Sequence, residues 1–323
     1  MNDIVNLLMK VGITLPESGQ EASTENIIQV AKQAENEGFD SLWVWERLMW
    51  PLKPQTPYPM TADGSHPVEF QNVLEPLETL SFVAANTERI GLGTCVMDML
   101  FHNPVGLARR FATLDIFSKG RAICGLGIGW MKDEYQASNV PFQERGKRAD
   151  EYIQVLKQIW MNDVSEFDGK FYRITASKIG PKPLQNPLPV YLGGFSPKSL
   201  SRIVRYDADG WLPVIGGPLQ LDFIKNNMEA VKDEARKANK DPNKFKTILL
   251  TYPKIADTSS SKQGKDGNER AAMTGTIDQI GEDIKRIKEF GVEHIIFGYN
   301  FSPLGREIST MMDISMQLAP FAK

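Results

Sequence analysis

The chain has 323 residues, a length that fits either two ordinary domains or one large α/β barrel with insertions. Its 37 lysines and arginines against 40 aspartates and glutamates give a net charge of −3, which offers no electrostatic basis for binding nucleic acid. Two cysteines cannot make a disulfide framework or a zinc ribbon, and no apolar run approaches the roughly 18 residues of a membrane helix. The N-terminal residues do not have the pattern of a signal peptide. We therefore expect a cytoplasmic globular protein that binds neither nucleic acid nor a membrane.

Short apolar runs rich in valine, isoleucine and leucine alternate with longer stretches of helical period along the first half of the chain. The runs are typical of buried parallel strands. One helix stops at Gly38, and another begins with Asn103 as its cap and Pro104 in its first turn. In chain order we expect strands within 7–15 and at 40–45, 89–97 and 121–128, and helices through 27–34, at about 76–86, from 104 onward and through 149–159.

The second half of the chain continues this alternation after a hairpin at 165–174, which is expected to turn at Asp168–Gly169. Ser196–Pro197 and Ser302–Pro303 each predict a capped helix start. Thr276 and Gln279 have the spacing of a capping box. The expected strands are 189–194, 209–214, 245–252 and 292–299, and the expected helices run from 197 onward, over 224–238, over 277–287 and from 303 onward.

Eight strands and eight helices in strict alternation predict an α/β fold, a (β/α)8 TIM barrel. A doubly wound sheet is the alternative, but it would usually carry a glycine-rich fingerprint after its first strand, and residues 15–19 are not one. Three connections that follow strands are long, at about 46–73, 129–144 and 253–275. We expect these insertions on the C-terminal face, where barrel enzymes carry their active sites. The polar segment 259–270 of the third connection is expected to be mobile.

Metal-dependent hydrolysis on a barrel needs clustered histidine and carboxylate ligands, and this chain has three histidines with no HxH or HExxH pattern. We therefore expect no metal site. His294 lies early in its strand, at the face opposite the active site, and is expected to be structural. His102 follows the third strand on the active-site face, as either a pocket residue or a helix-entry residue. Cys95 and Cys124 lie within strands, where a small buried side chain is the simpler interpretation.

Two glycine-rich segments end predicted strands on the active-site face. The first, Gly125–Trp130, either marks a tight barrel corner or lets the backbone approach a planar ligand. The second, Gly193–Ser196, places two glycines and a capping serine at a helix N-terminus, where unpaired N–H groups favour a phosphate. An ordinary strand-to-helix turn is the alternative interpretation of the second segment.

Several blocks of this sequence occur together in one known family. They are GFDSLWVWERL, the run from ERIGLGTCVM to GLGIGWMKDEY, PFQERGKRADEYI, DGKFYRI, PKPLQNPLPVYLGGFSPKSL and DADGWLPV. In order and spacing they resemble the bacterial luciferase-like flavin monooxygenase superfamily, and especially its branch of deazaflavin (coenzyme F420)-dependent oxidoreductases. The resemblance implies one luciferase-like TIM-barrel domain over 1–323, and the strand pattern predicts the same fold independently.

The resemblance also implies that the cofactor is FMN or the deazaflavin. In the family, a non-proline cis peptide at the end of the third strand supports the cofactor ring, and here it would fall at Cys95–Val96. The glycines of the fourth strand would border the ring, and the second glycine segment would hold the cofactor phosphate. The implied cofactor-binding residues are Thr94, Cys95, Val96, Gly127, Gly129, Trp130, Gly193, Gly194, Phe195 and Ser196.

The family pattern at the end of the second strand is an acidic residue followed by histidine, whereas this chain has Glu46–Arg47. Arginine cannot act as a general base near neutral pH, but it can stabilise an anion or orient a carboxylate. We expect both side chains to point into the pocket as catalytic groups, with Arg47 facing an anionic substrate or reduced cofactor and Glu46 pairing with it. A solvated surface ion pair is the alternative.

The resemblance implies an oxidoreductase or monooxygenase that acts on a small organic substrate, with either reduced FMN and oxygen or hydride transfer by the deazaflavin. A flavin-binding barrel without catalytic activity is the alternative. An apolar substrate pocket is expected near four residues, namely Trp45, Trp50, Met97 and His102. The expected partners are the substrate, a separate flavin reductase and a second copy of the chain in a homodimer.

Overall fold

A computed structural model describes residues 8–216, 221–256 and 270–323 of the chain. Eight parallel strands close into a ring: β1 (Lys10–Thr14), β2 (Ser41–Val44), β3 (Gly91–Thr94), β5 (Ala122–Gly127), β8 (Val190–Leu192), β9 (Gly210–Trp211), β11 (Lys246–Thr251) and β14 (His294–Phe297). The ring closes because β14 pairs with both β1 and β11, and β11 in turn pairs with β9. This confirms the predicted (β/α)8 barrel.

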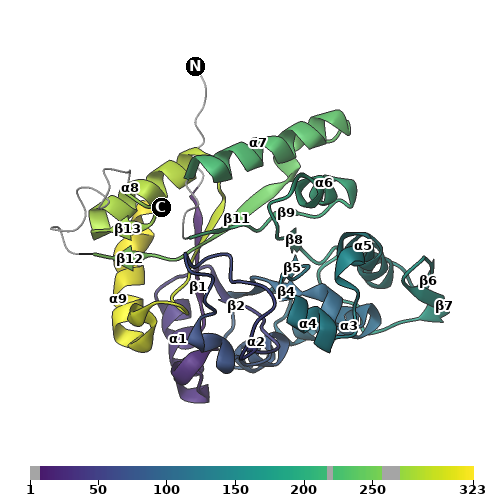
Figure 1. Cartoon of the computed structure of the whole chain (residues 1–323), viewed down its shortest axis with the longest axis horizontal. Coiled ribbons are helices and arrows are strands. Elements are labelled where there is room, and N and C mark those ends of the chain that lie inside the picture. Colours follow the sequence, from purple (N-terminus) through teal and green to yellow (C-terminus); the bar gives the residue numbers. More distant parts are fainter. Residues whose placement is uncertain (1–7, 217–220, 257–269) are drawn as a thin grey trace.

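Helices lie around the strands (Figure 1). The longer ones are α1 (Thr24–Asn36), α2 (Pro76–Ala84), α3 (Pro104–Phe117), α5 (Arg145–Met161), α6 (Pro197–Arg205), α7 (Leu221–Lys237), α8 (Ile277–Glu289) and α9 (Ile308–Leu318). The predicted caps are present. The Asn103 side chain accepts hydrogen bonds from the first turn of α3, and Thr276 and Gln279 form the capping box of α8. Among the described residues, no helix is both long enough and apolar enough to cross a membrane.

Three predicted elements are divided in the structure. The strand expected at 209–214 forms two short strands, β9 (Gly210–Trp211) and β10 (Val214–Ile215), which both pair with β11. The third strand stops at Thr94 and resumes as β4 (Met97–Asp98), because the backbone changes direction at the intervening Cys95–Val96 peptide. The last helix does not begin at Ser302–Pro303: a 3₁₀ turn at Pro303–Arg306 comes first, and the extended backbone of Glu307 separates it from α9.

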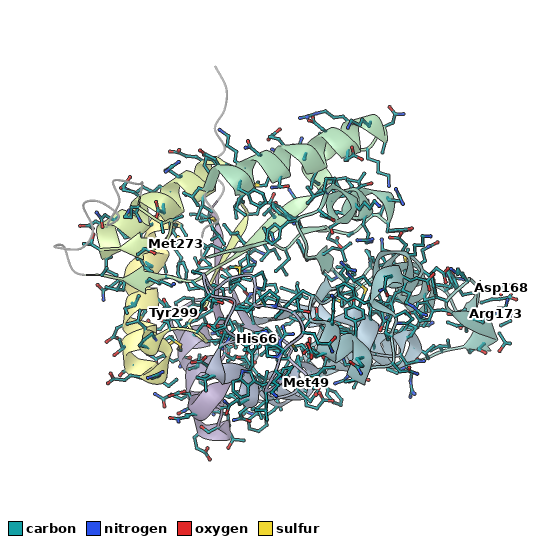
Figure 2. All side chains as sticks on the ribbon, in the orientation of Figure 1. Met49, His66, Asp168, Arg173, Met273 and Tyr299 are labelled. Atoms are coloured by element: carbon teal, nitrogen blue, oxygen red, sulfur yellow. The ribbon has the colours of Figure 1, made fainter. Side chains whose placement is uncertain are left out.

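The remaining elements are short. They are α4 (Lys132–Ala137), β12 (Lys254–Ile255), β13 (Thr274–Gly275), the hairpin strands β6 (Val164–Asp168) and β7 (Arg173–Lys178), and 3₁₀ turns at Gly19–Glu21, Val68–Gln71, Met99–Phe101, Phe142–Glu144, Pro242–Lys244 and Ala319–Phe321. The hairpin follows α5, and its turn begins after Asp168, which confirms the turn predicted at Asp168–Gly169. Figure 2 shows Asp168 and Arg173 at its tip, at the edge of the molecule and away from Met49 and His66.

The barrel interior is filled by the indole ring of Trp43, which is fully buried. A Cβ atom at Gly93 would lie 2.4 Å from that ring, so a glycine is required there for packing. The Trp43 Nε1–H donates to Ser41 Oγ at 2.6 Å, and Ser41 Oγ lies 2.8 Å from His294 Nε2. Burial lowers the pKa of His294 to about 3, so this histidine is a neutral, structural residue as predicted.

Three long connections emerge on the C-terminal face of the barrel. The first and second are joined by hydrogen bonds from Gln55 N to Asp133 Oδ2 (3.1 Å) and from Lys132 N to Thr56 Oγ1 (3.2 Å). The two insertions therefore form one covering layer over the strand ends. The predicted mobile segment 259–270 of the third connection lies almost entirely outside the described residues.

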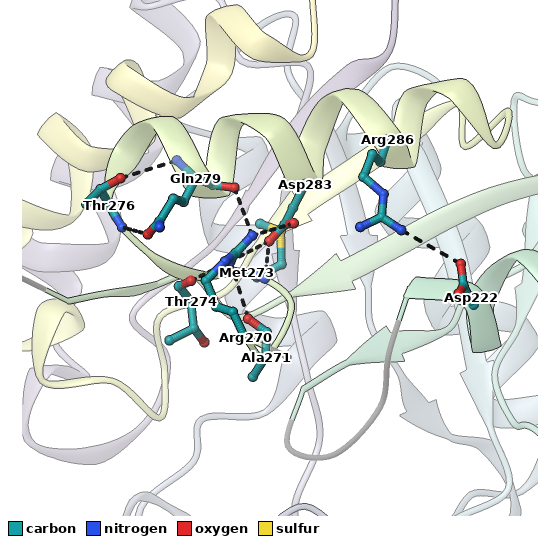
Figure 3. A network of polar contacts seen from close by, with 9 residues as sticks. All are labelled: Asp222, Arg270, Ala271, Met273, Thr274, Thr276, Gln279, Asp283 and Arg286. Carbon is teal, nitrogen blue, oxygen red and sulfur yellow. Dashed lines mark hydrogen bonds and ion pairs between the residues drawn. The ribbon is translucent and has the colours of Figure 1, made fainter. Parts of the chain in front are cut away.

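The end of the third connection is fixed to α8 by a polar network (Figure 3). The Arg270 guanidinium donates to both carboxylate oxygens of Asp283, at 2.8 and 2.7 Å, and Met273 N donates to Asp283 Oδ2 at 2.8 Å. A charge-assisted bidentate pair of this kind fixes orientation as well as position. This network therefore positions β13 immediately before the capping box of α8.

Candidate active site

A cavity of about 340 Å³ lies at the C-terminal end of the barrel, beneath the two joined insertions. Strand ends and the segments after them supply most of its wall, and seven of its lining residues are aromatic. Eleven residues predicted for the site line this cavity: Trp45, Glu46, Arg47, Cys95, Val96, Gly127, Gly129, Trp130, Gly193, Gly194 and Phe195. The structure thus brings together residues from the ends of the second to fifth strands.

Five predicted site residues do not line the cavity. Thr94 is fully buried and donates from Oγ1 to the Gly125 carbonyl at 2.7 Å, which joins two barrel strands. Met97 points the other way, into the main hydrophobic core, because side chains alternate along a strand. The other three are Trp50, which packs against the aromatic cluster at the barrel mouth, His102, which lies behind Glu46, and Ser196, which caps α6.

The Cys95–Val96 peptide bond is cis, as the family resemblance implies. It lies between β3 and β4, and the Cys95 and Val96 side chains both form part of the cavity wall. Gly127 faces this bulge across the strand pair, and a Cβ atom there would approach Val96 Cγ2 to 2.5 Å. The bulge and the glycine together leave a flat backbone surface on one side of the cavity.

The second glycine segment forms a tight turn before α6. Gly194 has φ +109°, a conformation that residues with a side chain rarely adopt, and its carbonyl accepts a hydrogen bond from Trp211 Nε1 at 2.8 Å. The Ser196 hydroxyl accepts from Ser199 N at 3.1 Å, so it caps the helix. Within the described ranges, the N–H groups of Gly194, Phe195 and Ser196 donate no hydrogen bond to another residue. These three donors are therefore available for an anion at the positive end of the helix.

Glu46 and Arg47 both line the cavity, but they do not pair with each other, and this part of the prediction is wrong. Arg47 Nη1 donates to Glu134 Oε2 at 2.5 Å, with the two side chains 7% and 0% exposed. Glu46 instead accepts from His102 Nε2 at 2.6 Å and from Asp98 N at 2.7 Å. Neither residue belongs to a solvated surface ion pair, so that alternative is also wrong.

The Arg47 guanidinium is enclosed by aromatic rings. Its Cζ atom lies 4.8 Å from the centre of the Phe70 ring and 5.2 Å from that of Trp130. Arg47 Nε is buried and has no hydrogen-bond partner among the described residues. Because Phe70 belongs to the first insertion and Trp130 to the second, Arg47 holds the two insertions together above the cavity.

Sequence reasoning missed several wall residues. Tyr58 and Phe70 come from the first insertion, Tyr252 and Phe301 follow the seventh and eighth strands, and Asp98 supplies a carboxyl group. Glu134 was also missed; it is fully buried and pairs with Arg47 without lining the cavity. The aromatic residues could have been found from their position just after strands or inside an active-site insertion.

A second cavity of about 290 Å³ shares Tyr58, Met60, Tyr252 and Phe301 with the first and adds polar groups such as Thr61, Glu69 and Lys254.

Two carboxyl groups of this region have strongly shifted pKa values. Burial raises the pKa of Asp98 from 3.8 to about 8, reinforced by Glu46 and Glu134 and opposed by Arg47. Burial likewise raises the pKa of Glu17, at the end of β1, from 4.5 to about 8. The described residues contain no group of three or more histidine, cysteine or carboxylate side chains that could hold a metal ion.

These features define a barrel with an aromatic cavity at its C-terminal face and, beside it, a turn whose N–H groups are unpaired among the described residues. The model of the luciferase-like monooxygenase family matches residues 7–265, and the chain belongs to this family.

Two curated proteins are similar to this chain in sequence. An uncharacterized protein of Mycobacterium tuberculosis is 34% identical over 183 residues, which are 56% of this chain and 65% of the relative's length. An F420-dependent glucose-6-phosphate dehydrogenase of Amycolatopsis mediterranei is 27% identical over 327 aligned residues, covering 90% of this chain and 92% of the relative.

Solved structures show the same fold. An F420-dependent secondary alcohol dehydrogenase in complex with an F420–acetone adduct superposes with a TM-score of 0.75 at 20% identity, covering 98% of this chain and 99% of the other. The monooxygenase RslO1 from Streptomyces bottropensis has a TM-score of 0.72 at 21% identity, with 97% and 99% covered. At sequence identities of 20% and 21%, these similarities show a shared fold.

Proposed function

We propose that this chain is an oxidoreductase that binds the ring of FMN or of the deazaflavin in the 340 Å³ cavity and acts on a small organic substrate there. The observation that carries the proposal is the shape of the cavity: the Cys95–Val96 bulge forms one side, and the unpaired N–H groups after Gly193 lie at one end. Family membership and the F420-dependent relative that matches 90% of the chain support it.

The residues present fit a planar, phosphate-bearing cofactor. Glycines at 127 and 193 leave the ring side of the wall free of side chains, since a Cβ atom at either would approach Val96, to 2.5 and 3.4 Å. Aromatic side chains offer flat apolar surfaces for the rest of the ring. The turn at Gly194–Ser196 offers three N–H donors for the phosphate. When bound, the cofactor would supply hydride transfer or, as reduced FMN, oxygen activation.

The protein's own contribution is orientation, charge and exclusion of water. Glu46 holds the His102 ring and the backbone at Asp98 in place through its two carboxylate oxygens. The Arg47 charge is shared with Glu134, so the guanidinium acts through its remaining N–H groups rather than as an isolated cation. The aromatic layer over Arg47 separates this polar cluster from solvent. The proposed substrate is therefore a small molecule with an apolar body and one polar group.

The choice of cofactor can be made by titration. Purified protein is titrated with FMN and with the deazaflavin, each oxidised and reduced, while ligand and tryptophan fluorescence are followed. The proposal predicts saturable one-to-one binding of at least one of the two, and Trp130 in the wall predicts quenching of protein fluorescence. Absence of binding by both would contradict the proposal.

Turnover separates the proposed enzyme from a flavin-binding barrel without activity. Oxidation or reduction of the bound cofactor is followed with and without candidate substrates, once in air and once without oxygen. Substrate-dependent turnover without oxygen favours hydride transfer, and turnover that needs oxygen favours the monooxygenase route. Cofactor binding with no substrate-dependent turnover would support the non-catalytic alternative.

The remaining proposals concern assembly and location. We propose a homodimer, a single domain over 1–323 and a cytoplasmic protein; a separate flavin reductase is needed only if reduced FMN is the cofactor. Analytical ultracentrifugation tests the dimer directly, and a mass equal to that of one chain at working concentration would contradict it.

A further inference from the structure

Asp98 places a carboxyl group in the cavity wall beside the bulge. It lies on β4, two residues after Val96, and is 5% exposed. Its side chain fills the space that Gly127 and Gly129 leave open: a Cβ atom at Gly127 would lie 2.8 Å from Asp98 Oδ1, and one at Gly129 would lie 3.5 Å from its Cγ. The Gly129 backbone N–H acts to lower the pKa of this carboxyl group, against the effect of burial. The carboxyl group is thus held in place while it faces the site proposed for the ring.

Burial and two neighbouring carboxyl groups oppose a negative charge on Asp98, whereas Arg47 and the Gly129 N–H favour one. Two further carboxyl groups, Glu46 and Glu134, face it from the end of β2 and from α4, and the phenol of Tyr135 lies on the same side. Among residues 8–216, 221–256 and 270–323, the cation that acts on Asp98 is Arg47, whose guanidinium is already bonded to Glu134 at 2.5 Å. An ionised Asp98 would therefore be a buried carboxylate with no cation of its own.

We propose, on the basis of the proposed function, that Asp98 is a neutral carboxylic acid that donates a hydrogen bond to an acceptor atom of the ring bound against the Cys95–Val96 bulge. The partner is a ring carbonyl oxygen or an unprotonated ring nitrogen, and FMN and the deazaflavin both carry such atoms. The raised pKa of Asp98, about 8 through burial and the two neighbouring carboxyl groups, agrees with this assignment. Asp98 is then a cofactor-binding residue whose effect depends on pH.

The first test needs no ligand. Infrared spectroscopy of the free protein at pH 7 should show the carbonyl absorption of a protonated carboxyl group, which disappears as the pH rises through about 8. Glu17 is a second buried acid with the same expected midpoint, so Glu17→Gln should remove one component and Asp98→Asn the other. The exposed Asp313→Asn serves as a control and should change nothing. An unchanged protonated component in Asp98→Asn would overturn the proposal.

The second test measures binding of FMN and of the deazaflavin between pH 7 and pH 9. Loss of the Asp98 proton should raise the dissociation constant about tenfold for the wild type and for Asp313→Asn. In Asp98→Asn the amide still donates, so the constant should change by less than about twofold. Binding that is equally pH-dependent in Asp98→Asn, or independent of pH in the wild type, overturns this inference alone. If neither ligand binds any variant at any pH, the proposed function fails and this inference fails with it.

Discussion

Replacing Glu17 with glutamine removes a titratable group from beneath the active-site end of the barrel. The Glu17 side chain is completely buried, and its carboxyl oxygens accept from Trp45 N at 3.1 Å and from Asn300 Nδ2 at 3.2 Å. Glutamine keeps the shape and one acceptor oxygen but cannot lose a proton. The substitution therefore removes the titration and one of the two hydrogen bonds, and only the loss of the titration changes with pH.

The sign of the effect follows from the pKa of Glu17, which is raised from 4.5 to about 8 by burial. Between these values the folded chain keeps the proton and the unfolded chain has lost it, so the free energy of unfolding falls as the pH rises. At about 1.4 kcal/mol per pKa unit, the fall from pH 6 to pH 8 due to Glu17 is about 2 kcal/mol. Asp98, with a pKa of about 8, adds a fall of similar size.

Urea unfolding at pH 6 and pH 8, followed by tryptophan fluorescence, measures this difference directly. The loss of stability between the two pH values should be about 2 kcal/mol smaller in Glu17→Gln than in the wild type, and smaller again when Asp98→Asn is added. Glu37→Gln, at the exposed end of α1, is the matched control and should follow the wild type. An equal loss of stability in the wild type and Glu17→Gln would refute the reasoning.

Three further predictions follow from packing and charge. Gly194→Val should weaken binding of FMN or the deazaflavin at least about tenfold, because the turn at φ +109° does not accommodate a branched side chain. The circular dichroism spectrum should stay unchanged. Unaltered affinity would mean that the phosphate binds elsewhere. Arg47→Ala should destabilise the fold by about 3 kcal/mol or more in denaturant unfolding, since it leaves Glu134 buried and unpaired. Adding Glu134→Gln should recover part of this loss of stability. No recovery would mean that the lost contacts of Arg47, and not the unpaired charge, cause the destabilisation. Gly93→Ala should lower the melting temperature, because its Cβ atom would lie 2.4 Å from the Trp43 ring, and overpacking typically costs about 1–3 kcal/mol; a wild-type melting temperature would contradict the packing of the barrel interior.

The barrel could be predicted from the sequence because its signals are local. The apolar run at 245–252 yields β11 (Lys246–Thr251), and Asn103–Pro104 and Thr276 mark helix starts by caps that the structure contains. The short helix α4 was missed, since its six residues show no apolar period. The division of the last helix was missed for a related reason, because the extended backbone of Glu307 has no signal in the sequence.

The pairing of charged residues in the site could not be predicted in the same way. Glu46 and Arg47 are neighbours in the sequence, but side chains of successive residues in an extended segment point to opposite sides. Their partners, His102 and Glu134, lie 56 and 87 residues further along the chain. Such contacts depend on how the strand ends and insertions meet on the C-terminal face. The place of Asp98 in the cavity wall was missed for the same reason, since its neighbours come from three separate segments.

The most direct test of the account is a crystal structure of the protein with the cofactor that titration selects. The account predicts that the ring lies in the 340 Å³ cavity against Cys95–Val96, with the phosphate at the N–H groups of Gly194–Ser196. A ring bound outside this cavity, or a phosphate held by other residues, would contradict it.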